Sequence, residues 1–209
     1  VNMAGNCIYD DEVCQNASKQ EIIRRYYSSL NRLAKGECKS EEVYKIELLM
    51  KQAKISTELR KVVSAALLRA ETTESPAAAI ELPDKSIVTA KTSDLLGASA
   101  ALILNAVKVL GNIDDSIHLI SPTVIEPVQK LKTNYLGSSN PRLHTDEILI
   151  ALSMCAASDD TAQLALEQLP KLRGCQVHTS VMLSNVDIKI FNKLGIQLTS
   201  EPRYEHRKL

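Results

Sequence analysis

The sequence predicts a mixed protein of the α+β or α/β class, in which a helical subdomain precedes a sheet with helices on both faces. Residues 10–75 place apolar side chains three and four positions apart, the spacing of helices that bury one face. Residues 76–200 instead alternate short apolar runs with helical segments, which is typical of a covered sheet. Because only 3% of the 209 residues are aromatic and Trp is absent, the core must consist of Ala, Leu, Ile and Val.

Three helices joined by short links are expected in residues 1–75, which we take as the helical subdomain. Their starts are marked by capping residues, in chain order Asp10 or Asp11, Ser40, and Ser56 or Thr57. The apolar pattern changes at Thr72–Pro76, so the second subdomain is expected to cover residues 76–200. Residues 201–209 form a charged tail.

The second subdomain is expected to open with a β-hairpin over 77–82 and 87–92, because Pro83-Asp84-Lys85-Ser86 is a turn signal. A long helix follows over 95–110, capped by Ser93 or Asp94 and ended by Gly111. The remaining expected elements are a strand at 117–120, a helix from Pro122, a loop at 132–144, helices at 145–157 and 159–169, a strand at 175–183, a helix at 186–194 and a strand at 196–199.

Composition excludes several classes of protein. Lys and Arg number 25 and Asp and Glu number 25, so there is no surplus positive charge for nucleic acid or for a membrane surface. No apolar run approaches the roughly 20 residues of a membrane-spanning helix. Five widely spaced cysteines without a C-x-x-C pair indicate reduced thiols in the cytoplasm. Cys175 and His178 are spaced C-x-x-H within an expected strand, which is a poor metal site, so we expect no metal.

The most site-like stretch is Asn140-Pro141-Arg142-Leu143-His144-Thr145-Asp146-Glu147, at an expected helix start. Arg142 suits an anion such as phosphate or carboxylate, and His144 can act as an acid or base near neutral pH. The alternative is ordinary capping by Thr145 or Asp146, with Arg142 paired to an acidic side chain.

Further candidate ligand-binding residues lie at strand ends and at the start of the chain. Lys91 and Thr92 end the expected second strand, where ligands gather in open α/β sheets, although Ser93 or Asp94 there also suits a cap. Ser121 follows the expected strand at 117–120 and is either a contact or a cap. Asn2 and Asn6 have amides that contact a ligand or brace a turn. Motifs of metalloproteases, hydrolase elbows, phosphate loops and dinucleotide folds are absent from the sequence.

Several segments resemble one bacterial family, the family catalogued as domain of unknown function 1846. They are residues 1–6 (VNMAGN), 19–26 (KQEIIRRY), 44–50 (YKIELLM), 78–82 (AAIEL), 118–122 (HLISP) and 140–144 (NPRLH). The resemblance runs along essentially the whole chain and implies that it is the C-terminal portion of a longer protein, whose larger N-terminal α/β part is missing. The apolar, Gly- and Asn-containing opening at Val1 agrees with such a fragment.

The resemblance also implies a three-layer α/β/α subdomain with the topology of cytidine deaminases. The deaminase signature requires H-x-E or C-x-E at one helix start and P-C-x-x-C at the next. The corresponding residues are Leu95–Ser99 and Pro122–Glu126, so the zinc ligands and the catalytic glutamate are absent. Deaminase chemistry is therefore not expected.

We expect the C-terminal part of a cytoplasmic enzyme that binds a small anionic or nucleotide-like metabolite at the interface with the missing part. His144 would transfer protons, and Arg142, Lys91, Thr92, Ser121, Asn2 and Asn6 would bind the ligand. The alternative is a non-catalytic structural module that drives assembly into a homo-oligomer. Substrate, reaction and cofactor stay open.

Overall fold

The computed structural model describes residues 10–205, and within them the chain divides into two compact units between Lys61 and Val62. The expected division lay at residues 75 and 76, one helix further along the chain. The difference arises because the third helix packs against the sheet, through Ala66 and Ala79, and so belongs with the second unit. Asn2 and Asn6, two candidate ligand-binding residues, lie outside the described residues.

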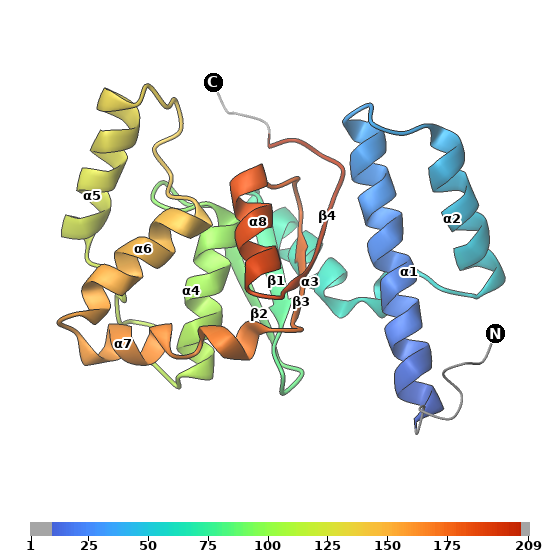
Figure 1. Cartoon of the computed structure of the whole chain (residues 1–209), viewed down its shortest axis with the longest axis horizontal. Coiled ribbons are helices and arrows are strands. Elements are labelled where there is room, and N and C mark those ends of the chain that lie inside the picture. The colour runs from blue at the N-terminus through green and yellow to red at the C-terminus, as the bar shows by residue number, and fades with distance from the viewer. Residues whose placement is uncertain (1–9, 206–209) are drawn as a thin grey trace. The chain divides into compact units, whose positions relative to one another are not determined.

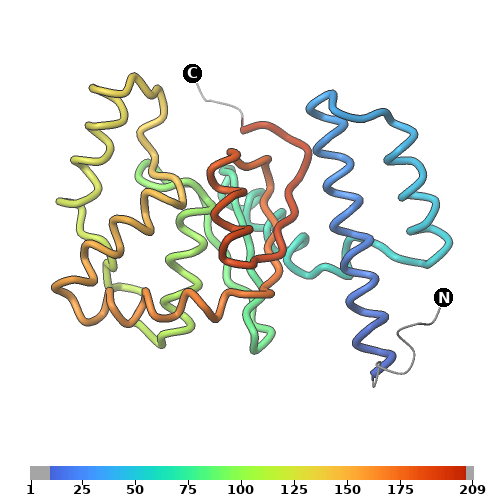
Figure 2. The backbone as a smooth tube through the Cα atoms, in the orientation of Figure 1, coloured from blue at the N-terminus to red at the C-terminus, as the bar shows by residue number. Residues whose placement is uncertain are grey.

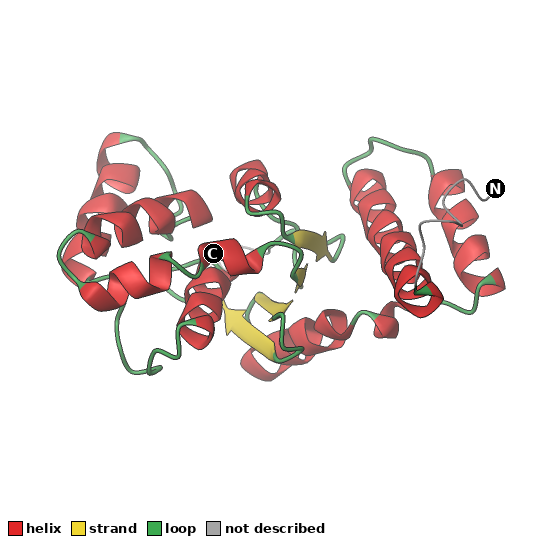
Figure 3. Ribbon diagram, turned by 60° about the horizontal axis from the view of Figure 1, so that its bottom comes forward, coloured by secondary structure: helices red, strands yellow, loops and turns green. Residues whose placement is uncertain are grey.

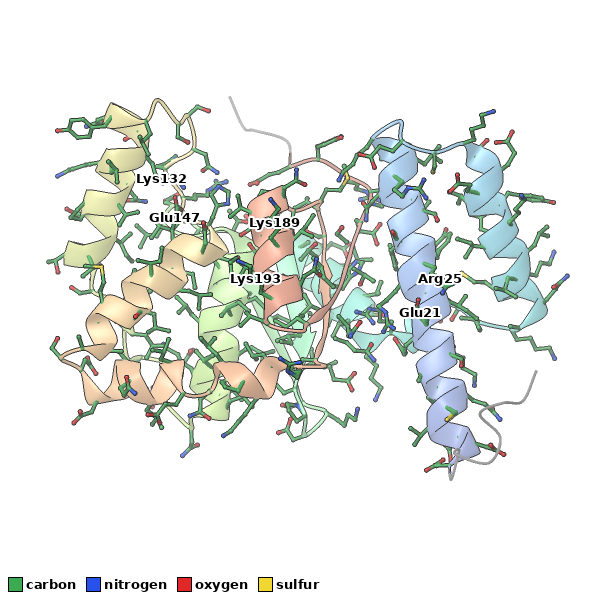
Figure 4. All side chains as sticks on the ribbon, in the orientation of Figure 1. Glu21, Arg25, Lys132, Glu147, Lys189 and Lys193 are labelled. Carbon is green, nitrogen blue, oxygen red and sulfur yellow. The ribbon has the colours of Figure 1, made fainter. Side chains whose placement is uncertain are left out.

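The first unit contains two long helices and a short 3-10 turn: α1 (Asp11–Ala34), α2 (Ser40–Gln52) and η2 (Thr57–Leu59). Asp10 caps α1 as expected, because its side chain accepts a hydrogen bond of 3.0 Å from the Val13 N–H. Figure 4 labels Glu21 and Arg25, which form an ion pair of 2.9 Å one turn apart on α1. Ile23 of α1 and Val43 of α2 are buried, as the periodicity predicts.

The second unit is built on a sheet of four strands in the order β2-β1-β3-β4. The strands are β1 (Ala77–Glu81), β2 (Ile87–Lys91), β3 (Gln176–Thr179) and β4 (Gln197–Ser200). β1 pairs antiparallel with both β2 and β3, whereas β3 and β4 are parallel. The antiparallel hairpin and the parallel β3–β4 pair, which is joined by a crossover helix, make the sheet mixed.

Helices cover both faces of this sheet, as Figure 3 shows. Side chains alternate along β1, so Ala79 meets Val62 and Ala66 of α3 (Lys61–Thr73), while Ala78 and Ile80 face the larger core on the other side. That core is mostly aliphatic, as the composition predicts, with Phe191 as its one aromatic member. The helices on this side include α4 (Ala98–Leu110), α6 (Thr145–Ala156), α7 (Asp160–Leu166) and α8 (Asn185–Lys193).

The path between α4 and α6 differs from the expected one. Residues 117–120 form no strand and only bend at 119–120, although Leu119 and Ile120 are buried. Burial of a short apolar run does not require pairing in a sheet, so the expected strand is wrong. The chain continues through α5 (Pro122–Lys130) directly into η3 (Leu131–Tyr135), a single π-helical turn, and then follows the loop to α6 that Figure 2 traces. A short 3-10 turn, η4 (Leu169–Leu172), precedes β3.

The start of α4 also differs from the expected one. The helix begins at Ala98 with Gly97 at its cap, not at Ser93 or Asp94. The Ser93 hydroxyl instead accepts from the N–H groups of Leu95 and Leu96 in a separate turn. This turn lets Leu96 pair with Leu143 in an isolated parallel bridge, which places the start of α4 beside the segment that leads into α6. Over residues 10–205, none of the helices has the length and apolar character needed to span a bilayer.

Candidate functional site

His144 occupies the cap position of α6, one residue before the expected caps Thr145 and Asp146. Its backbone N–H donates to the Glu147 carboxylate at 2.7 Å. Thr145 is fully buried, and its N–H and hydroxyl both donate to Oδ1 of Asp187, at 2.9 and 2.6 Å. Carboxylates therefore accept from the N–H groups of His144, Thr145 and Glu147 at this helix start, and they also suit the positive end of the helix dipole.

Asp187 lies in the first turn of α8 and is the centre of this arrangement. Its side chain is buried, and besides Thr145 its carboxylate accepts from Ser184 Oγ at 2.8 Å and contacts His144 Nδ1 at 3.2 Å. Burial alone raises the pKa of a carboxyl group, but the hydrogen bonds from His144, Thr145 and Ser184 outweigh it. The pKa of Asp187 is consequently well below its ordinary value, and this buried group is a carboxylate at neutral pH.

His144 responds to this carboxylate. The hydrogen bond to Asp187 raises the pKa of the imidazole above 6.5, although partial burial opposes the shift. With Nδ1 turned to Asp187, the other ring nitrogen, Nε2, lies on the opposite side of the ring. Across residues 10–205, the structure gives Nε2 no hydrogen-bond partner. A histidine held in this way by a buried carboxylate has a fixed orientation and one nitrogen available for proton transfer.

A cavity of about 120 Å³ adjoins this histidine. The starts of α4, α6 and α8 all contribute to its wall, and Figure 1 shows these three helices close together within the second unit. The lining residues fall into three segments and three single positions, namely 97–99, 140–144 without Pro141, 181–184, and Thr92, Asp187 and Glu205. Helix starts carry unpaired N–H groups and a partial positive charge, so a cavity built from them favours anions.

Arg142 lines the same cavity. Its Nη1 donates to Oε1 of Glu205 at 2.7 Å, and the two side chains are 34% and 40% exposed. The alternative considered from the sequence, that Arg142 pairs with an acidic side chain, is therefore confirmed by the structure. Because a half-exposed ion pair contributes only about 0–1 kcal/mol, this pairing holds Arg142 weakly and leaves it able to exchange partners.

Lys132 of η3 binds the segment that carries Arg142 and His144. Figure 4 labels Lys132 and Glu147, whose Nζ and Oε2 atoms lie 2.8 Å apart. Lys132 Nζ also donates to the backbone carbonyl of Arg142 at 2.5 Å, and its side chain is 9% exposed. The π-helical turn thus places one buried ammonium group between the loop and the first turn of α6. Such turns are frequent at functional sites.

The remaining residues predicted from the sequence are divided between the cavity and other places. Thr92 lines the cavity with Arg142 and His144, but Lys91 and Ser121 do not. Lys91 is exposed at the end of β2, and Ser121 caps α5 by accepting from the Thr123 N–H at 3.3 Å. The capping interpretation of Ser121 is therefore confirmed.

Polar residues of this cavity that reasoning from the sequence missed include Ser99, Ser184, Asp187 and Glu205. Ser184 and Asp187 have a signal in the sequence, because S-x-x-D before an apolar run is a capping pattern. Ser99 has none, since a serine within a run of small residues resembles an ordinary packing position.

The region between residues 10 and 205 contains no group of three or more His, Cys, Asp or Glu side chains placed to hold a metal ion. His178 is fully buried in β3, where Nδ1 contacts Thr199 Oγ1 at 2.9 Å. The Cys175 sulfur contacts the Lys171 carbonyl at 3.6 Å, and burial raises the pKa of this thiol. Both contacts are typical of structural side chains rather than of metal ligands.

Two family models match the chain. The C-terminal model of the family described as domain of unknown function DUF1846 matches residues 58–209, and its N-terminal model matches residues 1–54. The expectation that the chain represents the C-terminal portion alone is therefore wrong, because residues 1–54 fall under the N-terminal model.

Curated relatives match over the whole chain. The chain is 54% identical over 209 residues to the UPF0371 protein of Corynebacterium diphtheriae and 51% identical over 209 residues to that of Corynebacterium urealyticum. It is 47% identical over 209 residues to the UPF0371 protein of Streptococcus uberis. In each case the match covers 100% of this chain and 42% of the relative, so the chain spans less than half the length of these proteins.

Proposed function

The chain belongs to the family described as domain of unknown function DUF1846, and we propose that its second unit forms the acid–base site of an enzyme acting on a small anionic, nucleotide-like metabolite. One observation carries the proposal. His144 lines a cavity together with the buried Asp187 carboxylate, which contacts its Nδ1, and its Nε2 is available. In this position a histidine exchanges a proton with a bound molecule while the carboxylate holds its tautomer and orientation.

Arg142 supplies the second role, which is to bind the anionic group. Its guanidinium presents a planar set of donors that matches carboxylate and phosphate. Glu205 accepts a hydrogen bond of 2.7 Å from this guanidinium, so a negatively charged ligand competes with a carboxylate of the same chain. The contact with Glu205 supports the proposed role, because it shows that an oxyanion reaches Arg142 at the cavity wall.

The volume of the cavity limits what it accommodates. Pockets that enclose a whole small molecule measure roughly 300–1,000 Å³, whereas this one is about 120 Å³. We therefore place one charged group of the metabolite here and the rest at an interface with parts of the protein beyond this chain. The relatives, of which the chain covers 42%, have room for such parts.

The proposal also includes a cytoplasmic location and a topology like that of cytidine deaminases. The four cysteines among residues 10–205 are free thiols, which supports a reducing, cytoplasmic location. The hairpin followed by a helix supports a topology like that of cytidine deaminases, although the expected strand at 117–120 is absent. Since fold alone assigns no function, the topology adds nothing to the chemistry proposed for His144.

A second candidate function is assembly into a homo-oligomer without catalysis. Large apolar side chains are exposed at the end of η3 and on α6, among them Tyr135 at 81% and the next residue, Leu136, at 71%. Exposed apolar surface of this kind is typical of contact surfaces between proteins. Light scattering of the purified protein tests it, because a monomer at micromolar concentration would exclude stable assembly through this surface.

Thermal-shift screening tests the first proposal. The protein is heated with a panel of phosphorylated and carboxylated metabolites, including nucleotides, and a ligand of the folded state raises the midpoint. His144→Gln and Arg142→Ala should abolish the shift caused by any hit. His118→Gln and Arg69→Ala, which change an exposed histidine and an exposed arginine elsewhere, should retain it. The proposal fails if His144→Gln and Arg142→Ala retain the thermal shift, as His118→Gln and Arg69→Ala are expected to do.

A further inference from the structure

The start of α4 brings unsatisfied hydrogen-bond donors to the cavity. Gly97 caps this helix of 13 residues without a side chain, and its own N–H reaches the Leu143 carbonyl at 3.4 Å. Over the described part of the chain, the next N–H groups, those of Ala98, Ser99 and Ala100, have no hydrogen-bond acceptor. At the starts of α6 and α8, the Thr145 N–H donates to Asp187 and the Asp187 N–H donates to Ser184 Oγ. The start of α4 lines the same cavity, and no side chain caps it.

Ser99 provides an independent observation at the same place. Its side chain is 4% exposed, lines the cavity and, between residues 10 and 205, forms no hydrogen bond with the protein. A buried hydroxyl without a partner is unfavourable. The oxygen is not among the atoms fully enclosed by protein, so its remaining surface opens on the cavity. Thr92 also lines the cavity, with 8% exposure and no protein partner for its hydroxyl in the described region.

Several polar groups at this cavity are donors without a protein partner. They are the N–H groups of Ala98 and Ser99 and the hydroxyls of Ser99 and Thr92, and Arg142 and His144 line the same cavity. The lone pairs of Asp187 are engaged by four donors, so this carboxylate does not oppose an incoming anion directly. A ligand with several acceptor oxygens and negative charge is what such a set recognises.

We propose that the first turn of α4, with the hydroxyls of Ser99 and Thr92, is the binding subsite for a phosphate group whose far side meets Arg142 and His144. The three or more oxygens of a phosphate engage both walls at once, which the two oxygens of a carboxylate cannot do. A cavity of about 120 Å³ accepts such a group and little more. This proposal names the ligand class of the site. It rests on the proposed function, which assigns anion binding to Arg142 and proton transfer to His144.

The test measures binding of inorganic phosphate and of phenyl phosphate to the protein by titration calorimetry, with acetate as the carboxylate comparison. The amide resonances of Ala98, Ser99 and Ala100 are followed by NMR in the same titrations. Both phosphates should bind and move these resonances, and acetate should bind at least tenfold more weakly. Tighter binding of phenyl phosphate indicates a phosphate monoester as ligand, and tighter binding of inorganic phosphate indicates the free ion.

Variants then locate the binding on α4. Ser99→Ala should weaken phosphate binding about tenfold, the usual effect of losing one hydrogen bond to a charged group. Thr92→Val should weaken it several-fold, and Ser153→Ala, an exposed helical serine on α6, should leave it unchanged. The unmodified protein tests the subsite even if a variant misfolds. If the amide resonances of Ala98, Ser99 and Ala100 do not move when phosphate saturates the protein, the proposed subsite is wrong.

The two proposals fail separately. If Arg142→Ala and His144→Gln abolish phosphate binding but Ser99→Ala does not weaken it, the subsite is wrong and the acid–base site stands. If Ser99→Ala weakens binding while Arg142→Ala and His144→Gln have no effect, the subsite stands and the proposed function fails. Equal binding of acetate and phosphate, or no binding of either phosphate at millimolar concentration, overturns the phosphate assignment.

Discussion

Replacing Asp187 by Asn tests how the buried carboxylate controls His144. The amide has nearly the same shape and keeps an oxygen for the two donors of Thr145, which now lie 2.9 and 2.6 Å from Oδ1. At the other position an NH₂ group replaces Oδ2, so it donates to Ser184 and to His144 Nδ1. The imidazole must then accept at Nδ1 and carry its proton on Nε2, which reverses the tautomer required of a base facing the cavity.

The magnitude follows from the contacts that are lost. Two of the four charge-assisted hydrogen bonds become neutral ones, and the ion pair with His144 disappears. We expect Asp187→Asn to lower the free energy of unfolding by about 1.5–3 kcal/mol, less than the roughly 3–5 kcal/mol for removing one partner of a fully buried pair. Urea denaturation measures this loss. Asp187→Ala should lower the free energy of unfolding further, because it leaves the donors without an acceptor.

The pH dependence of that loss has a definite sign. Asp187 has a lowered pKa, so its contribution is present above 3.8 and disappears as the pH falls through its pKa in the folded protein. The pKa of His144 is raised, so its contribution is complete below 6.5 and disappears as the pH rises through its pKa in the folded protein. The difference in free energy of unfolding between the unmodified protein and Asp187→Asn should therefore be largest between pH 3.8 and 6.5 and become smaller above that range.

NMR titration of the His144 ring provides the direct assay. In the unmodified protein its midpoint should lie above 6.5, and Asp187→Asn should move it downward. His144→Gln identifies the resonance by removing it. A midpoint that does not change in Asp187→Asn would refute the reasoning, because the hydrogen bond to Asp187 is the main cause assigned to the raised pKa.

Two further substitutions test the surroundings of the cavity. Glu205→Gln should tighten binding of inorganic phosphate about two- to fivefold in calorimetry, since it weakens an exposed competitor for Arg142; weaker binding would contradict that role. Lys132→Met should lower the free energy of unfolding in urea by about 2–3 kcal/mol, because it leaves the partly buried Glu147 without its ion pair. Lys130→Met, on the exposed side of the same segment, is its control and should change stability little; equal losses would show that Lys132 has no special role.

The fold was predictable where periodicity and capping agree. Asp10 caps α1 and the Pro83–Ser86 turn joins β1 to β2, as their residue types require. The start of α4 was not predictable, because Ser93 has the chemistry of a cap and satisfies a local turn instead. Local hydrogen bonding by serine competes with helix capping, and only the bridge between Leu96 and Leu143 decides between them.

The site was half predictable for a similar reason. Arg142 and His144 stand out in the sequence because a cation and a titratable ring precede a helix start. Asp187, the group that orients His144, is 43 positions away in the sequence, and no local pattern joins the two. Lys91 and Ser121, which were predicted from a strand end and from a strand-to-helix turn, do not line the cavity that holds Arg142 and His144.

The cavity also has a consequence for the synthesis of the protein. Its wall begins at Thr92 and is completed by Ser184, Asp187 and Glu205, so almost the whole second unit must leave the ribosome before the cavity exists. Until then α6 emerges with the donors of Thr145 unpaired and His144 without its carboxylate. A nascent or truncated chain that ends before α8 lacks Asp187, and therefore lacks the carboxylate that contacts His144 Nδ1 in the folded protein.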